Sequence, residues 1–250
     1  MPFTTVGWVE SQNTGGVLTN FTALSDPHVR VEGDNVIVPS GMNFLAGVYA
    51  GGASITQARI HSPSLSRVVD IDIGPLNVGA EPLSPTPFLD MFENPVELDA
   101  TEALSALAAG SESTNEYKEI IAWLSSGRIE PYRGPYRTVR ATGSTTLNAY
   151  EWTNVSLTLA QSLPAGRYQV VGFWGYSAGG VAARLVFPGY PWRPGAIIHD
   201  SIADIQPLRF RFGNAGVWGE FTHDSPPSVD FLSVSADTSE VVYLDIVKVG

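Results

Sequence analysis

Short runs of β-branched and aromatic residues, interrupted by glycine, proline, asparagine and aspartate, recur along the whole chain. Such runs predict β-strands that end at turns. Apolar and polar positions alternate clearly at 240–248, EVVYLDIVK, and at 207–212, PLRFRF. We expect strands near 4–10, 17–22, 28–38, 43–50, 54–61, 66–73, 116–124, 137–142, 147–158, 167–176, 181–187, 195–199, 207–212, 228–234 and 240–248.

One segment has the pattern of a helix. Residues 99–109, DATEALSALAA, contain good helix formers, with Asp99 or Thr101 as an N-cap and Gly110 as a stop. The helix could extend through 114–125, TNEYKEIIAWLS. That segment also resembles TSEVVYLDIVKV at 238–249, which ends the chain as a strand, so helix and strand both remain open at 116–124.

The middle of each half of the chain repeats. Residues 38–65 align without a gap with residues 163–190, a shift of 125 positions in a chain of 250. Matched glycine and proline constrain the backbone alike, and a half-length repeat indicates duplication. We therefore expect two similar halves. The identical pairs are Pro39/Pro164, Gly41/Gly166, Gly47/Gly172, Ala53/Ala178, Ala58/Ala183, Arg59/Arg184 and Pro63/Pro188.

The segment 125–136, rich in serine, glycine and proline, is the predicted linker. It divides the chain into an N-terminal domain, 1–130, and a C-terminal domain, 131–250. Each half holds roughly seven or eight short strands, which is typical of a sandwich or a barrel. We predict an all-β fold of two tandem eight-stranded jelly-roll sandwiches with little helix. Two further Pro-rich stretches, 81–95 and 187–195, are expected to be loops or arms.

Composition narrows the possible functions. The net charge of −11 argues against binding nucleic acid through a basic surface. The chain has no cysteine, so it has neither disulfides nor thiolate chemistry. Nothing in the sequence indicates a cofactor.

One motif in the sequence resembles a catalytic signature, and it contains a serine. Residues 175–179, GYSAG, match the nucleophile elbow of α/β-hydrolases around Ser177. His223 could act as base, with Asp200, Asp204 or Asp230 as its partner. However, the motif needs a helix after the serine, and AGGVAARLVF before Pro188 leaves room for about two turns. We therefore expect a structural turn and no catalytic residue.

The sequence also contains candidate metal ligands and candidate contact residues. The four histidines lack a close metal-ligand spacing. Asp70 and Asp72 share a strand face and could offer two oxygens to Ca²⁺, but solvated carboxylates are the simpler interpretation. We predict no metal site. Pro191, Trp192 and Arg193, in a loop between prolines, are candidate subunit-contact residues because tryptophan and arginine are enriched at interface hot spots.

The half-length repeat, the two all-β halves and the Pro/Gly connector give the chain a resemblance to a family. It resembles the double jelly-roll major capsid proteins of tailless icosahedral viruses, the lineage of tectiviruses, corticoviruses and adenoviruses, in the compact form of small phages. The resemblance implies a non-enzymatic homotrimer of pseudo-hexameric outline that tiles a virion shell assembled in the host cytoplasm. It also implies neighbouring trimers and a penton as partners, with an internal membrane possible beneath.

Two alternatives remain. Scattered aromatic residues could serve as platforms for sugars, which would make the chain a carbohydrate- or ligand-binding pair of β-sandwiches. The second alternative is a serine hydrolase that uses Ser177.

Overall fold

A computed structural model describes residues 3–10, 16–52, 54–77, 89–110, 118–198 and 215–250. Within these ranges the regular structure consists of β-strands and one short 3₁₀ helix, η1 (Leu65–Arg67). The prediction of an all-β fold with little helix is therefore confirmed. Across the same ranges, no helix has the length and apolar character needed to cross a membrane. The strand predicted at 207–212 and most of the Pro-rich stretch 81–95 lie outside the described residues.

The chain forms two compact units. One consists of residues 6–128, and the other combines residues 129–250 with residues 1–5. The polypeptide therefore passes between the units twice, at Thr5/Val6 and at Arg128/Ile129. The linker predicted at 125–136 contains the second of these crossings.

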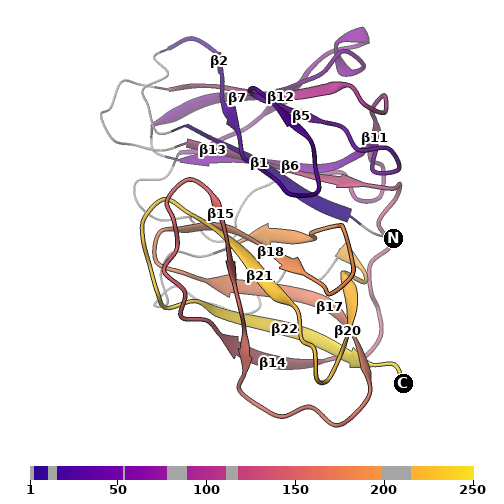
Figure 1. Cartoon of the computed structure of the whole chain (residues 1–250). Helices are drawn as coiled ribbons and strands as arrows, with labels where there is room; N and C mark the ends of the chain where they lie inside the picture. The colour runs from indigo at the N-terminus through magenta and orange to yellow at the C-terminus, as the bar shows by residue number, and fades with distance from the viewer. Residues whose placement is uncertain (1–2, 11–15, 53, 78–88, 111–117, 199–214) are drawn as a thin grey trace. The chain divides into compact units, whose positions relative to one another are not determined.

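The unit of residues 6–128 is built from two layers of strands (Figure 1). Its first sheet has the order β10 (Leu89–Asp90), β6 (Phe44–Gly52), β13 (Lys118–Ser125), β1 (Phe3–Glu10), β3 (Thr22–Ala23). Two further short strands, β9 (Leu76–Asn77) and β11 (Val96–Glu97), also pair with β6. Its second sheet has the order β4 (Val31–Glu32), β5 (Asn35–Ile37), β12 (Ala103–Gly110), β7 (Ile55–His61), β8 (Ile71–Ile73), with β2 (Thr19–Asn20) beside β12.

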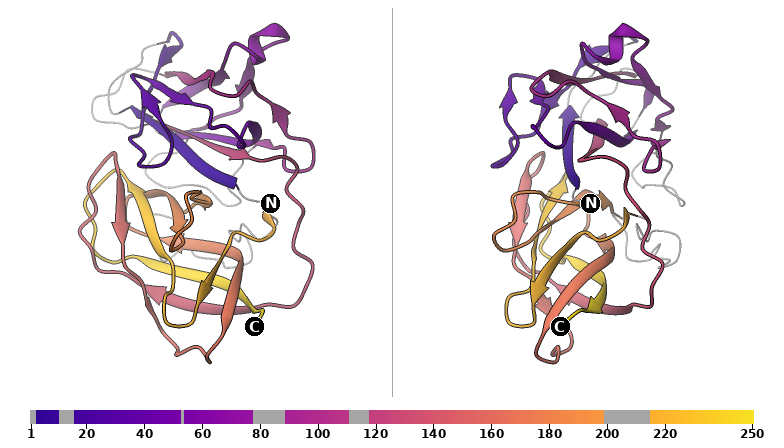
Figure 2. Two further views of the ribbon diagram at one scale, coloured as in Figure 1. Left: turned by 45° about the vertical axis from the view of Figure 1, so that its right-hand side comes forward. Right: turned by 90° about the vertical axis from the view of Figure 1, so that its right-hand side faces the viewer.

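The unit that contains residues 129–250 also has two layers, which the turned views of Figure 2 separate. One sheet has the order β16 (Thr158–Leu159), β14 (Arg137–Thr142), β22 (Val241–Lys248), β17 (Arg167–Tyr176), β20 (Gly219–Thr222). The other has the order β15 (Trp152–Val155), β21 (Ser228–Ser233), β18 (Gly180–Val186), β19 (Gly195–Ile197).

The strand order is that of a jelly roll in both units. In each unit the first long strand pairs with the last long strand, which in turn pairs with a central strand. The order is β1–β13–β6–β10 in one unit and β14–β22–β17–β20 in the other. The companion sheets match as well, as β5–β12–β7–β8 and β15–β21–β18–β19. Each unit thus holds eight principal strands in two sheets, and the predicted pair of jelly-roll sandwiches is confirmed.

Two β-bulges recur at matching positions. The pairing of β6 with β13 skips Ala46, and the pairing of β17 with β22 skips Val171. Likewise, Thr56 is skipped between β7 and β12, and Val181 between β18 and β21. Each pair of bulges is separated by the repeat length of 125 positions (171 − 46 and 181 − 56). The repeat in the sequence therefore extends to the irregularities of the backbone, which bend and twist a strand locally.

The helix predicted at 99–109 is wrong. Residues 103–110 form β12, which pairs with β5 on one side and β7 on the other. Thr101, with φ of 67°, lies in the turn that precedes the strand. The preference of alanine and leucine for helix amounts to tenths of a kcal/mol per residue, so pairing on both edges and the burial of most side chains of the strand outweigh it. Of the two alternatives left open at 116–124, the strand holds for the described residues, because β13 starts at Lys118.

Aromatic side chains fill the cores. In the unit that contains residues 129–250, the Trp218 ring lies with its centroid 5.2 Å from that of Phe3 and 5.6 Å from that of Phe173. In the other unit, Trp8 and Trp123 are fully buried. Most of the tryptophans spread along the sequence therefore serve as core residues.

Candidate functional site

Ser177 lies in a turn that joins the two sheets of its unit. Strand β17 ends at Tyr176, and β18 begins at Gly180 in the opposite sheet. The Ser177 side chain is fully buried, and its hydroxyl donates to Oδ2 of Asp237 at 3.2 Å. The same oxygen accepts the backbone N–H of Ala178 at 2.7 Å. A nucleophile elbow leads into a helix and exposes its serine, whereas this turn leads into a strand and buries it.

The other residues considered for a serine hydrolase have different partners. Nδ1 of His223 accepts the backbone N–H of Gly166 at 3.4 Å. Asp230 is buried and binds two arginines. Asp200 and Asp204 lie outside the described residues. The structure therefore does not bring Ser177, His223 and Asp230 together as a catalytic set.

The loop between β18 and β19 carries the predicted contact residues. Pro191 is exposed and Trp192 is half-buried. Arg193 turns inward: its guanidinium donates to Oδ2 of Asp230 at 3.0 Å, and its backbone N–H donates to the Thr4 hydroxyl at 3.2 Å. Its backbone carbonyl accepts the N–H of Thr5 at 2.9 Å. Arg193 thus anchors the loop within its unit, while Pro191 and part of Trp192 remain accessible to a partner.

Asp230 is the centre of a buried polar cluster. Nε of Arg184, which is fully buried, donates to Oδ2 of Asp230 at 3.0 Å, and Asn154 donates to Oδ1 at 2.8 Å. The Arg184 guanidinium also lies 4.2 Å from the centroid of the Trp152 ring and donates to the Thr5 carbonyl at 3.1 Å. The carboxylate therefore compensates the buried guanidiniums, which would be costly alone.

The sequence repeat pairs Arg184 with Arg59, yet the two arginines have different environments. Nε of Arg59 donates to Oδ1 of Asp72, on strand β8, at 2.7 Å, and this pair lies at the surface. Arg184 instead pairs with an aspartate on β21, which corresponds to β12 in the other unit. No signal in the repeat could have indicated this change of partner, because the aspartates occupy different strands.

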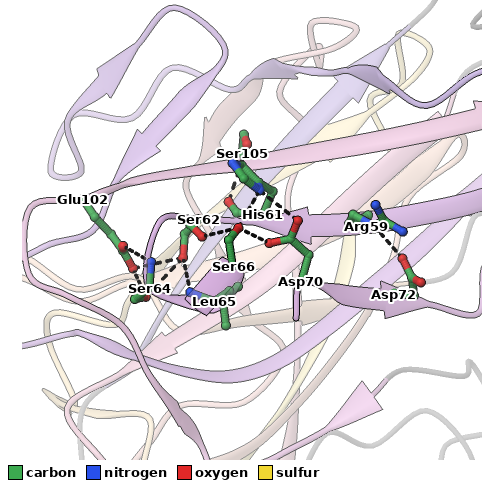
Figure 3. A network of polar contacts seen from close by, with 10 residues as sticks. All are labelled: Arg59, His61, Ser62, Ser64, Leu65, Ser66, Asp70, Asp72, Glu102 and Ser105. Carbon is green, nitrogen blue, oxygen red and sulfur yellow. Dashed lines mark hydrogen bonds and ion pairs between the residues drawn. The ribbon is translucent and has the colours of Figure 1, made fainter. Parts of the chain in front are cut away.

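A polar network surrounds η1 in the unit of residues 6–128 (Figure 3). Ser66 Oγ donates to Oδ1 of Asp70 at 2.7 Å, and His61 Nδ1 lies 2.9 Å from Oδ2 of the same carboxylate. Ser66 Oγ also lies 3.2 Å from His61 Nδ1. In a catalytic triad, serine and carboxylate bind opposite nitrogens of the imidazole, whereas both lie at Nδ1 in this network. We therefore interpret the contacts among His61, Ser66 and Asp70 as structural, and we call these three residues the clamp.

The clamp stabilises the charged form of Asp70. Burial acts to raise the pKa of its carboxyl, but the hydrogen bonds from His61 and Ser66, together with the charge interactions with His61 and Arg59, outweigh burial and hold the pKa below its usual value. Asp72 lies on strand β8, which begins just after Asp70, and pairs with Arg59. Neither carboxylate belongs to a group of three or more potential metal ligands, and the described part of the chain holds no such group.

Glu102 fixes the other side of the same loop. Its Oε1 accepts the Ser62 hydroxyl at 3.0 Å and also the Ser64 hydroxyl, while its Oε2 accepts the Ser64 N–H at 2.8 Å. Arg67 forms an ion pair with Asp99. Sequence reasoning missed this network, because it depends on a turn that brings three serines of one loop to the carboxylates of Glu102 and Asp70.

Fold and site together define an all-β protein of two jelly-roll sandwiches. No family model matches the sequence, and no curated protein matches it. Among solved structures, the chain is similar to the major capsid protein P2 from bacteriophage PM2. The two share 11% sequence identity over 99% of this chain and 97% of that chain, with a TM-score of 0.27. The assignment of the fold rests on the strand order described above.

Proposed function

We propose that the chain is a structural major capsid protein whose homotrimers, pseudo-hexameric in outline, tile an icosahedral virion shell. The observation that carries the proposal is the presence of two jelly rolls with one strand order and two shared bulges in a single chain. Three copies around a threefold axis would supply six similar units. Such a trimer can occupy a position with six neighbours in a closed shell.

The surface supports a role in assembly. Only 16% of the residues are charged, and the sheets end in short edge strands such as β3, β4 and β16. Short edges limit uncontrolled pairing, and lateral packing of sandwiches would cover the remaining apolar surface. In this proposal Pro191 and Trp192 contact a neighbouring subunit, and the shell also includes other virion proteins such as a penton.

The test is the mass of the native assembly. Light scattering at micromolar concentration should give a trimer or larger species, and negative-stain images should show shell fragments or hexagonal capsomers. A stable monomer of 26.8 kDa across salt and pH would contradict the proposal.

One observation favours a second candidate function, carbohydrate binding. A cavity of about 200 Å³ beside β20 is lined by polar and charged side chains together with Phe221 and Pro188; the polar ones belong to Arg167, Glu220, Thr222 and Ser225. Such side chains can exchange hydrogen bonds with sugar hydroxyls. A glycan that binds there should raise the melting temperature of the parent protein. The Thr222→Val variant should lose that shift, whereas Thr19→Val, which changes a residue of the other unit, should retain it.

A further inference from the structure

The two units of the chain differ sharply in charge. The unit of residues 6–128 contains 15 acidic and 5 basic side chains, whereas the other unit contains 10 and 9. Their formal net charges, with histidine neutral, are therefore −10 and −1, which together give the −11 of the chain. Two copies that meet through their acidic units repel each other, and a contact between unlike units avoids most of that repulsion.

Three arginines form a basic segment near the start of the less acidic unit. Arg137 and Arg140 lie on β14, and Arg133 lies in the linker that leads to this strand. All three are exposed, and none of them forms an ion pair with another described residue. The sequence contains no carboxylate side chain between positions 131 and 150. We call these three residues the arginine segment.

The strands beside β14 leave the arginine segment positive. Strand β22 contributes Asp245, which is buried and whose carboxylate accepts the Thr138 hydroxyl at 2.7 Å. The same strand contributes Lys248, which is exposed. Strand β16, on the other side, has no charged residue, and Glu130 precedes the segment in the chain. Four positive and two negative side chains therefore leave a net charge of +2.

The unit of residues 6–128 carries the opposite charge along one edge of a sheet. Asp90 on β10 and Glu97 on β11 flank Glu93, and all three side chains are exposed. Both strands pair with β6, and residues 41–58, which contain β6, have no charged side chain. We call Asp90, Glu93 and Glu97 the acidic edge.

Among the described residues, no basic side chain forms an ion pair with the acidic edge. Positions 68–117 contain ten acidic residues and no lysine or arginine. The basic residues that bracket this stretch are engaged elsewhere, because Arg67 forms an ion pair with Asp99 and Lys118 is fully buried. The chain therefore presents uncompensated carboxylates on one unit and uncompensated arginines on the other.

We propose that the arginine segment of one copy binds the acidic edge of a second copy. The proposal rests on the proposed function, since it names a contact through which the trimers form. Because the two surfaces lie on different units, the contact is heterologous, and a heterologous contact that closes after three copies gives a ring. Every copy in such a ring supplies one arginine segment and one acidic edge, so the charges are matched around the whole trimer.

Other anionic partners match the arginine segment less well. Nucleic acid and anionic lipid present continuous arrays of phosphates, which call for a larger basic surface than three arginines. The net charge of −11 also repels such arrays at long range. A second copy instead offers three carboxylates for three arginines, and it is present wherever the protein is.

The first test is charge reversal of the arginine segment. We expect Arg133→Glu/Arg137→Glu to raise the concentration at the midpoint of assembly by about tenfold or more, measured by sedimentation at low salt. The difference from the parent should shrink as added salt screens the charges. The matched control is Arg30→Glu/Arg67→Glu, which changes the net charge equally at two exposed arginines of the acidic unit. This control should not weaken assembly, because it makes the acidic unit more negative.

Reversal of the acidic edge should then restore assembly. Glu93→Arg/Glu97→Arg alone should weaken assembly, and its combination with Arg133→Glu/Arg137→Glu should return the midpoint to within about threefold of the parent. Unchanged assembly of the arginine variant, equal weakening by the control, or absence of this rescue would overturn the proposal. So would binding of the parent to a single-stranded DNA oligonucleotide, or to phosphatidylcholine–phosphatidylglycerol vesicles, that the arginine variant loses.

The second test locates the contact without charge reversal. Because the chain has no cysteine, Glu93→Cys/Arg137→Cys introduces the only two thiols. A short bismaleimide should link the copies of this variant into covalent trimers on a denaturing gel. The control Glu32→Cys/Arg137→Cys places the first thiol at another exposed position of the same unit and should stay monomeric. Monomers alone from the first variant, or equal linking of the control, would overturn the proposal.

The outcomes separate this proposal from the proposed function. If the parent protein assembles and the arginine variant assembles equally well, the contact assignment fails and the shell function stands. If the parent protein never assembles, both fail.

Discussion

Gly47 and Gly172 each directly follow the unpaired residue of a bulge, at the same place in the two jelly rolls. Gly47 lies opposite Trp123 on β13, and Gly172 lies opposite Asp245 on β22. The equivalence predicted from the sequence repeat is therefore confirmed for these glycines. The residues opposite them differ completely in chemistry, so the backbone geometry has been kept while the side chains around it have changed.

Gly172 is needed for close packing against Asp245. A Cβ at position 172 would lie 2.5 Å from Oδ2 of Asp245. We expect Gly172→Ala to lower the free energy of unfolding by about 1–3 kcal/mol, measured by urea denaturation, because a buried strand cannot easily shift. Gly74→Ala is the matched control, since a Cβ there meets no atom within 4 Å. Equal effects of the two substitutions would contradict the packing argument.

Asp230 should matter far more to stability than Asp72, although each pairs with one of the two repeated arginines. Asp230→Asn leaves the buried Arg184 without its compensating charge, and we expect a loss of about 3–5 kcal/mol. Asp72→Asn breaks an exposed pair with Arg59 and should cost less than about 1 kcal/mol. Chemical denaturation of both variants checks the difference. Similar losses would show that burial does not separate the two pairs.

Glu119 makes stability depend on pH between the ordinary pKa of glutamate and about 8. Burial raises the pKa of its carboxyl to about 8, and the Tyr49 hydroxyl, 3.3 Å from Oε1, lowers it only in part. The raised pKa favours the neutral acid in the folded state. Stability from this group is therefore complete below the ordinary pKa of glutamate and is lost as pH rises towards and through about 8. Glu119→Gln should flatten this fall in unfolding experiments from pH 5 to pH 9, and an unchanged slope would refute the assignment.

Asp70 makes the opposite contribution at acid pH. Its pKa is held below the ordinary value, so its stabilisation is present above that ordinary value and is lost as pH falls through the folded-state pKa. At neutral pH, Asp70→Asn should cost about 1 kcal/mol through weakened bonds to His61 and Ser66. The difference between variant and parent should shrink in acid. A difference that stays constant down to low pH would mean that the clamp does not depend on charge.

Ser177 should not react as a nucleophile. It is buried and donates its hydroxyl to Asp237, so we expect no labelling by a fluorophosphonate probe. The test is intact-protein mass spectrometry of the treated parent, with Ser177→Ala as the control. Stoichiometric labelling that the variant abolishes would revive the hydrolase alternative.

The sequence correctly predicted those segments in which glycine and proline restrict the backbone conformation directly. Strand β7 spans 55–61 and β18 spans 180–186, the same segment shifted by the repeat length of 125. Glycine and proline limit the backbone locally, so their spacing carries this information without knowledge of tertiary contacts. The prediction of a helix at 99–109 was wrong because contacts that are distant in the sequence decide the structure of this segment. Alanine prefers helix only weakly, and the partners on both edges of β12 are distant in sequence.

The polar sites were less predictable. The pattern could place Asp70 and Asp72 on one strand face, but it could not show that one of them closes a loop with Ser66 and the other meets Arg59. Similarly, the sequence offered Arg193 as a candidate subunit-contact residue but could not show that its guanidinium binds Asp230. Such partners are chosen by turn geometry and by strand order, which a linear pattern of residue types does not contain.

Strand β1 divides its residues between the two units, and this has a consequence for any attempt to produce one half of the chain alone. Phe3, Thr4 and Thr5 contact Trp218, Arg193 and Arg184 of the unit that contains residues 129–250, while the rest of the strand belongs to the other unit. A fragment that begins at Ile129 would lack these three residues and would leave the Trp218 ring without Phe3. A cut at the linker alone therefore removes part of the core of one unit, and residues 1–5 would have to be supplied to such a fragment as a separate peptide.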